Sequence, residues 1–405
     1  MIAQGTLAAL KQTAESVTGK CLREPLRHPM RGERRLVSAS KELRWLSLCG
    51  ASLHNVRSAD LRIPVGRLSV FTGISGSGKS TMMRGLLKPA VQAALAAKHK
   101  GGVFKLRDGS ILRGAEAIEA VYEVDQSPIG KTSRSTPATY LGVFDHIRSL
   151  FASTPLARIR GYEAGRFSFN SQGGRCEACL GQGVLKIEMN FLPPAHVRCP
   201  DCDGTRYALS TLEVLYQGRS IADVMSMPMD EAVEFFAVHP AIARPLRLLC
   251  ETGLGYLTLG QASQTLSGGE AQRLKLVSEL VRGIGRSEHK RIRKGVEVRS
   301  VLYLLEEPTI GLHMADVRHL LGVLHRLVDA GHTVVVIEHH TAVIAEADHL
   351  IEVGPEAGAS GGLVTAEGTP EKIAVERASR IGPFLKPILG SGAGSGRAKR
   401  GLRAS

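Results

Sequence analysis

Short apolar runs lead into glycine-rich loops and then into stretches of helical period in two parts of the chain. The apolar runs predict strands at Leu68–Thr72, 301–305 and Thr333–Ile337, and the last two flank a predicted helix around Met314–Asp329. Strands that alternate with helices in this way are typical of a mainly parallel α/β sheet. We therefore expect an α/β core that begins near Leu36 and resumes near residue 230.

The segment between these two parts has a different character. It is rich in Gly, Pro, Arg and Cys and has weak periodicity, which indicates an insertion with its own organisation. The predicted domains are a leading tail and linker (1–35), a first core part (36–122), the insertion (123–229), a second core part (230–389) and a small, polar, basic tail (390–405) that we expect to be disordered.

A short repeat joins the two ends of the chain. The sequence A-Q-G-T (3–6) is followed ten residues later by S-x-x-G-x-x-L (16–22), and A-E-G-T (366–369) is followed at the same spacing by S-x-x-G-x-x-L (379–385). Chance matching of such short pieces is the alternative. We interpret residues 1–30 as the tail of a preceding, similar lobe, so that the chain is the second half of a tandem protein.

Charge adds a candidate partner to this picture. The chain of 405 residues carries 52 Lys and Arg against 38 Asp and Glu, a net charge of +14. Such a balance favours a polyanionic partner, most often nucleic acid, although a basic chain can simply be basic. No apolar run of about 18 residues is present, and the first residues lack the layout of a signal peptide, so we expect a soluble cytoplasmic protein without a membrane partner.

A phosphate-binding loop follows the first predicted strand. The sequence G-I-S-G-S-G-K-S (73–80) fits G-x-x-x-x-G-K-[ST] and opens a predicted helix, which is the context that the motif needs. Lys79 is expected to reach the β- and γ-phosphates of ATP, and Ser80 to ligate Mg²⁺. The expected nucleotide contacts are Gly73, Ser75, Gly76, Ser77, Gly78, Lys79, Ser80 and Thr81.

Two carboxylates follow the strand at 301–305, in the sequence E-E-P. We assign Glu306 to the water shell of the metal and Glu307 to the polarisation of the attacking water. His339, which follows the apolar strand and Glu338, is predicted to contact the γ-phosphate, although a lone histidine is more often structural. Gln126, in V-D-Q-S-P, is predicted to sense the metal or the water.

The sequence L-S-G-G-E (266–270) completes an ATPase motif set. It precedes a predicted helix, so Ser267 and the amides of Gly268 and Gly269 are expected to bind a γ-phosphate. Such a loop is weak evidence alone, but with the phosphate loop and E-E-P it specifies an ABC-type ATPase. In that class the signature loop of one lobe closes over ATP that another lobe holds, so one lobe cannot complete a site.

Four of the seven cysteines form two C-x-x-C pairs, Cys176/Cys179 and Cys199/Cys202. Two close pairs at this spacing favour a closed tetrahedral Zn²⁺ site, which is structural because no position is left open. Four free thiols and a redox pair are the alternatives, and His196 is expected to be a bystander. Basic residues surround the module, and Arg166, Arg175, Lys186 and Arg206 are candidate DNA contacts, with a solvated face as the alternative.

Together these residues resemble the UvrA family of ABC-type ATPases from about Ser38 to Leu389. The resemblance rests on the following motifs: V-D-Q-S-P-I-G (124–130), P-A-T-Y (137–140), G-R-F-S-F-N (165–170), G-G-R-C-E-A-C (173–179), F-L-P-P (191–194), L-G-Q-A-S-Q-T-L-S-G-G-E-A-Q-R (259–273) and V-V-V-I-E-H (334–339). It implies an ATPase with ATP, Mg²⁺ and Zn²⁺, which binds distorted double-stranded DNA as a dimer and works with UvrB-like and UvrC-like subunits in excision repair.

The chain departs from the family in places. The strand that corresponds to 301–305 in the family, the Walker B strand, normally ends in Asp-Glu. This chain has Glu306 at the first of these positions, and its side chain is longer, so slower hydrolysis is expected. T-I-G-L-H (309–313) matches the family's T-T-G-L-H only in part, a basic run occupies 286–294, and the family's N-terminal half is missing from the sequence, so the partner is a second copy or that half. A nucleotide-dependent binding module with little turnover and a UvrA-like resistance protein are the alternative functions.

Overall fold

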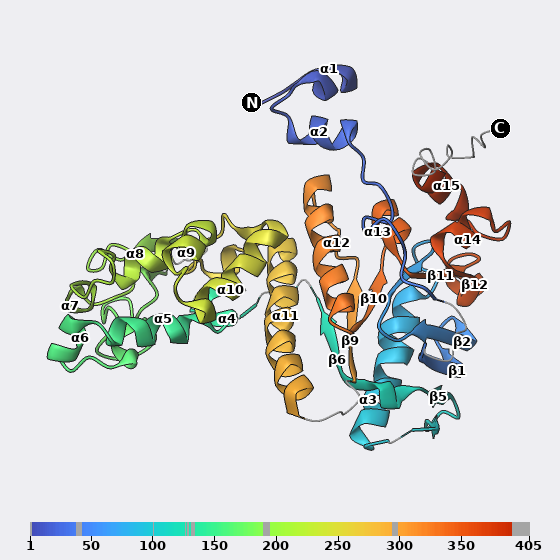
Figure 1. Cartoon of the computed structure of the whole chain (residues 1–405), viewed down its shortest axis with the longest axis horizontal. Coiled ribbons are helices and arrows are strands. Elements are labelled where there is room, and N and C mark those ends of the chain that lie inside the picture. Colours follow the sequence, from blue (N-terminus) through green and yellow to red (C-terminus); the bar gives the residue numbers. More distant parts are fainter. Residues whose placement is uncertain are drawn as a thin grey trace, which may run out of the picture. The chain divides into compact units, whose positions relative to one another are not determined.

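The computed structural model describes residues 2–37, 43–99, 101–125, 127, 129–130, 134–188, 195–293 and 299–390 (Figure 1). The chain divides into two compact units. The first combines Met1–Asp125 with Arg286–Ser405, and the second is Gln126–Gly285. Most of the predicted insertion (123–229) lies in the second unit. Residues 189–194 and 391–405 lie outside the described residues.

A six-stranded sheet in the order β12-β11-β3-β10-β9-β6 is the centre of the first unit. Every pair is parallel except β11 with β12. β3 and β10 are buried at every position, which is why they appear in the sequence as continuous apolar runs. The strands are β3 (Leu68–Thr72), β6 (Ile118–Val124), β9 (Ser300–Glu306), β10 (Thr333–Ile337), β11 (His349–Gly354) and β12 (Leu363–Gly368).

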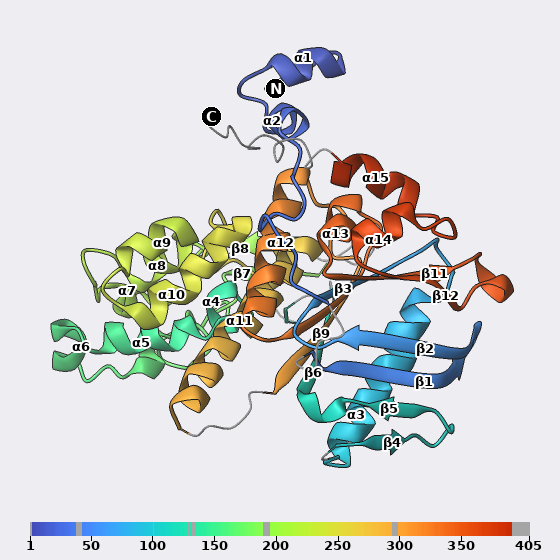
Figure 2. The same ribbon diagram turned by 45° about the vertical axis from the view of Figure 1, so that its right-hand side comes forward.

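Helices and a second sheet cover the two faces of this sheet (Figure 2). On one face lie a π-helical segment, η1 (Thr81–Leu87), and α3 (Lys88–Ala96), whose buried side chains share one apolar cluster with both sheets. The other face carries α12 (Met314–Asp329) and α13 (Thr341–Glu346). The second sheet is antiparallel and consists of β1 (Trp45–Leu53), β2 (Val56–Pro64), β4 (Val103–Lys105) and β5 (Ile111–Arg113). The predicted α/β class is confirmed.

The terminal repeat has a structural counterpart, because both copies form the same helical hairpin. The Ser16 hydroxyl accepts from the amide of Gly19 at 3.0 Å, and Ser379 accepts from Gly382 at 2.9 Å. In both hairpins a Cβ on that glycine would collide with a carbonyl oxygen, at 2.1 Å and 2.6 Å respectively. The local structure therefore repeats with the sequence. The helices are α1 (Leu7–Gln12), α2 (Val17–Arg23), α14 (Pro370–Val375) and α15 (Gly382–Gly390).

The second unit is mainly helical and has its own aromatic core around Phe144, Phe169 and Tyr207. This core continues through Leu274 and Val277 of the signature helix, so the unit extends to Gly285 and not to the predicted boundary at 229. No helix among the described residues is long and apolar enough to span a membrane. The elements are α4 (Pro137–Tyr140), α5 (Val143–Ala152), α6 (Pro155–Ile159), β7 (Val184–Ile187), β8 (Ala195–Arg198), α7 (Leu209–Leu212), α8 (Ile221–Ser226), α9 (Met229–Phe235), α10 (Pro240–Leu249) and α11 (Gly268–Arg293).

Candidate nucleotide site and four-cysteine centre

The glycine-rich loop at 73–80 joins β3 to η1 at the carboxyl end of the central sheet. Gly73 has a φ of +138°, and a Cβ there would lie 2.0 Å from the carbonyl oxygen of Val353 in β11. Only glycine can therefore occupy the first position of the loop. The Ser77 hydroxyl is buried and has no hydrogen-bond partner within the described chain, whereas Ser75 and Ser80 are exposed.

Lys79 is folded over its own loop. Its Nζ donates to the carbonyl oxygens of Gly73 at 2.9 Å and Ile74 at 2.7 Å, and the side chain is almost completely buried. Burial lowers the pKa of the Lys79 ammonium, and the nearby carboxylates of Glu307 and Glu306 oppose that shift. The ammonium is thus held above the loop, in reach of any phosphate that the loop binds.

Glu306, at the end of β9, connects the strand to the loop. The Ser80 hydroxyl donates to Glu306 Oε1, and Arg84 Nη1 lies 2.8 Å from Oε2. Arg84, in η1, also pairs with Glu123 of β6, and Glu123 pairs with Lys88. The two predicted magnesium ligands are therefore in contact, and an arginine that the sequence reasoning missed is bound to one of them.

Glu307 and His339 face each other beside this group, with His339 Nε2 3.4 Å from Glu307 Oε1. Both side chains are partly exposed, as groups that act on a nucleotide must be. Glu307 has a φ of +44°, and its amide donates to the Ile337 carbonyl at 2.9 Å. The structure thus brings Lys79, Ser80, Glu306, Glu307 and His339 together, and Gln126 lies outside the described residues.

Glu338 is a second residue whose importance the sequence reasoning missed. Its side chain is buried, and its two oxygens accept from the amides of Thr309, His339 and His340 at 2.8, 2.9 and 3.0 Å. One carboxylate therefore fixes the loop after E-E-P against the loop that carries His339. The available signal was a charged residue directly after a fully apolar strand.

The signature loop belongs to the second unit and begins α11. The Ser267 amide donates to Glu270 Oε2 at 2.7 Å, and the Glu270 amide lies 3.3 Å from the Ser267 hydroxyl, which is a capping box. The Tyr256 hydroxyl donates to the other oxygen of Glu270. Ser267 and Gly268 are exposed at this helix start, and Gly269 is half-buried, so the Ser267 side chain and the amides of the two glycines face the region where an anion would bind.

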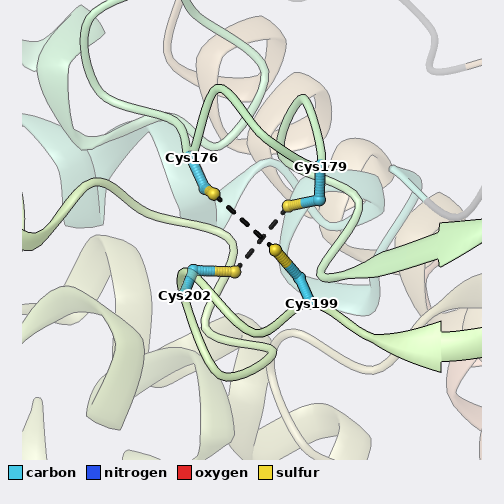
Figure 3. A group of neighbouring side chains, drawn as sticks. All are labelled: Cys176, Cys179, Cys199 and Cys202. Carbon is cyan, nitrogen blue, oxygen red and sulfur yellow. Dashed lines mark hydrogen bonds between the residues drawn. The ribbon is translucent and has the colours of Figure 1, made fainter.

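The four cysteines of the C-x-x-C pairs point toward one common centre (Figure 3). The sulfurs of Cys176 and Cys199 are 3.9 Å apart and those of Cys179 and Cys202 are 3.7 Å apart, and all four lie within 4.8 Å of one another. Zn–S bonds of about 2.3 Å in a tetrahedron give S–S edges of about 3.8 Å. Burial raises the pKa of Cys202 to about 12, so the thiolate is unfavourable without a nearby positive charge. A bound metal cation would stabilise that thiolate. The residues therefore fit a tetrahedral metal.

The four candidate DNA contacts all have local partners. Arg175 pairs with Glu177 at 3.1 Å and Lys186 with Glu188 at 2.8 Å, both on the surface. The Arg166 guanidinium lies over the Tyr162 ring, and Arg206 lies over Phe169, where burial lowers its pKa. Side chains of the basic run at 286–294, and that of His196, lie outside the described residues.

Comparison with known proteins gives relatives along almost the whole chain. It is 52% identical over 390 residues to UvrABC system protein A of Thermus thermophilus, covering 96% of this chain and 38% of that protein. For the protein of the same name from Aquifex aeolicus, the values are 47%, 96% and 40%. The crystal structure of UvrA2 from Deinococcus radiodurans superposes with a TM-score of 0.80 at 45% identity, over 96% of this chain and 44% of that one. No protein-family model matches. The chain spans about two fifths of the length of the curated relatives.

Proposed function

The chain belongs to the UvrA family, and from that premise we propose that it binds and hydrolyses ATP as part of a DNA damage-recognition protein of excision repair. The observation that carries the proposal is the contact between Ser80 and Glu306, with Lys79, Glu307 and His339 around them. These five residues lie together at the carboxyl end of the central sheet, which supports their proposed roles in phosphate binding, metal binding and water polarisation.

In the proposed reaction, Lys79 and the loop amides bind the β- and γ-phosphates. Ser80 and Glu306 would hold Mg²⁺, which would supply positive charge to the phosphate oxygens. Glu307 accepts a proton from the water whose oxygen bonds to the γ-phosphorus, while the bond between that phosphorus and the bridging oxygen breaks and ADP leaves. His339, oriented by Glu307, donates to the γ-phosphate. Ser267 with the amides of Gly268 and Gly269 closes the site of another lobe, which a second copy or an N-terminal UvrA half provides.

We assign Zn²⁺ to the four cysteines as a structural ion that organises the surrounding hairpin and loops. Double-stranded DNA is the proposed ligand, bound through basic side chains of the second unit, and UvrB-like and UvrC-like subunits are the proposed partners. Arg175 and Lys186 are the best placed of the predicted contacts, because surface ion pairs exchange readily for phosphate.

A nucleotide-dependent binding module with little turnover is the second candidate. It is favoured by the longer side chain of Glu306 and by Arg84, whose guanidinium lies 2.8 Å from one oxygen of that carboxylate. The positive charge of Arg84 opposes the approach of a metal cation to Glu306.

Phosphate release from ATP, measured with and without duplex DNA, separates these candidates. Hydrolysis above that of a Lys79→Ala variant supports the ATPase, whereas equal rates with intact nucleotide binding support the binding module. DNA affinity is measured in the same series at increasing salt and is expected to fall steeply; a flat response would contradict phosphate contacts.

A further inference from the structure

A second glycine-rich segment, residues 355–362 (P-E-A-G-A-S-G-G), packs against the outside of the phosphate loop. It joins β11 to β12, and we call it the buttress loop. Its Gly358 amide donates to the Gly76 carbonyl at 3.1 Å, and its Gly362 amide donates to the Ser77 carbonyl at 2.8 Å. Two consecutive carbonyls of the phosphate loop are therefore held by one neighbouring segment.

These bonds determine where the amides of the phosphate loop point. In a trans peptide the C=O and the N–H of one unit lie on opposite sides. The Gly76 carbonyl points outward to the buttress loop, so the amide of Ser77 in the same peptide unit points inward. The Ser77 carbonyl also points outward, so the amide of Gly78 points inward. The Ser77 amide points toward another part of the same loop, since it donates to the Ile74 carbonyl at 3.3 Å.

Asn55, in the turn between β1 and β2, contacts both the phosphate loop and the buttress loop. Its Nδ2 donates to the Gly358 carbonyl at 3.1 Å and lies 3.5 Å from that of Gly76. The packing leaves no room for side chains, since a Cβ on Gly362 would lie 2.1 Å from the Asn55 carbonyl oxygen and one on Gly361 3.0 Å from that of Ser77. Gly361 and Gly362 of the buttress loop are thus required by close backbone approach.

The buttress loop is in turn anchored on the C-terminal helical hairpin. Arg380, just before α15, forms an ion pair with Glu356. Its amide and that of Ile381 donate to the buried carboxylate of Glu352 in β11, at 2.8 and 3.0 Å. An unbroken series of contacts therefore runs from the α14–α15 hairpin to the phosphate loop.

We propose that the buttress loop is a positioning element of the nucleotide site, which holds the amides of the phosphate loop in their binding orientation and makes ATP affinity depend on Arg380. The inference rests on the proposed ATP binding at Lys79 and extends it to residues that touch no nucleotide. Preorganised donors bind more tightly because their ordering cost is met before the ligand arrives.

The test compares glycines with the same backbone angle in the full-length chain. Gly362→Ala places a methyl against Asn55 at a φ of +84°, whereas Gly109→Ala, at +87° in the β4–β5 turn, meets nothing within 4 Å. The readout is the dissociation constant of a fluorescent ATP analogue, with thermal unfolding without nucleotide measured in parallel. We expect the dissociation constant of Gly362→Ala to rise at least about tenfold through lost preorganisation, and that of Gly109→Ala to stay unchanged.

Two further variants keep the inference testable if Gly362→Ala does not fold. Asn55→Ala removes the bridging amide without a clash, and Arg380→Ala is expected to raise the dissociation constant about two- to fivefold, as for an exposed ion pair, with recovery in Arg380→Lys. Dissociation constants equal to that of Gly109→Ala, or changes in unfolding temperature alone, would overturn the inference. Failure of the unmodified chain to bind, or equal binding by Lys79→Ala, would instead overturn the proposed function and the inference with it.

Discussion

Removal of the Arg84 charge is expected to strengthen Mg²⁺ binding. Arg84 Nη1 lies 2.8 Å from Glu306 Oε2, so a cation already occupies one side of the carboxylate that we assign to magnesium. Arg84→Ala leaves that oxygen to the metal. The fold should tolerate the change because the Arg84 side chain is 49% exposed and Glu123 keeps Lys88 as its partner.

The size of the effect follows from the spacing of the two cations. The arginine contact, a Mg–O bond of about 2.1 Å and the width of the carboxylate place them about 6 Å apart. In water the repulsion between a single and a double charge at that distance is about 1.4 kcal/mol. A Debye length of about 8 Å at physiological salt reduces this to about 0.7 kcal/mol, which corresponds to roughly threefold in affinity.

The assay is a Mg²⁺ titration of the binding of a fluorescent ATP analogue. The half-saturating Mg²⁺ concentration should fall about threefold in Arg84→Ala, and the difference should shrink as salt is added. Arg84→Lys keeps the charge and should match the unmodified chain, and Arg107→Ala controls for loss of an exposed arginine elsewhere in the same unit. A higher requirement for Mg²⁺ in Arg84→Ala would refute the reasoning and indicate that Arg84 orients Glu306.

Three other predictions follow from the described contacts. Cys199→Ser should reduce bound zinc from one per chain to a trace and impair DNA binding more than ATP binding, because the cysteines belong to the second unit; metal analysis that finds zinc retained would contradict the assigned ion. Glu338→Gln should lower turnover while the Michaelis constant for ATP stays near its original value, since the lost carboxylate orients His339 and not the phosphate loop. The control is Glu346→Gln, which removes another buried carboxylate in the same unit and should leave turnover unchanged. Equal losses of turnover in the two variants would assign both carboxylates to folding alone. Burial alone would raise the pKa of Glu346, but hydrogen bonds from His28 and His325 outweigh it and hold the pKa at about 2, so its contribution of about 2 to 4 kcal/mol is complete above about pH 4.5 and is lost as the pH falls toward 2; urea unfolding should show Glu346→Gln destabilised at pH 7 and the difference reduced at pH 3.

Local chemistry was readable from the sequence wherever one short segment contains all its parts. The phosphate loop, its strand at Leu68–Thr72 and the C-x-x-C pairs needed only spacing and composition. Arg84 and Asn55 were missed because their partners lie in other strands or loops, and no spacing within the chain brings those partners together. The part that could not be read for Glu338 is its bond to the Thr309 amide, which lies in another loop.

The boundary of the second unit was misplaced for a related reason. The signature helix carries an ATPase motif, which led to its assignment to the core part, but Leu274 and Val277 of that helix are buried with the aromatic residues of the insertion. A motif reports the chemistry of a segment, whereas its apolar face decides with which unit it folds.

The pairing of β6 with β9 has a consequence for how the protein is made. These strands are neighbours in the central sheet, with Val124 opposite Leu305, yet the whole second unit separates them in the chain. Loop closure of this length adds little to the equilibrium cost, since each doubling costs only about 0.6 kcal/mol. During synthesis, however, the edge of β6 stays unpaired until the ribosome has synthesised the second unit and β9. Early metal capture by the insertion would shorten that exposure by condensing the intervening chain, so zinc-starved cells should accumulate aggregated rather than merely inactive protein.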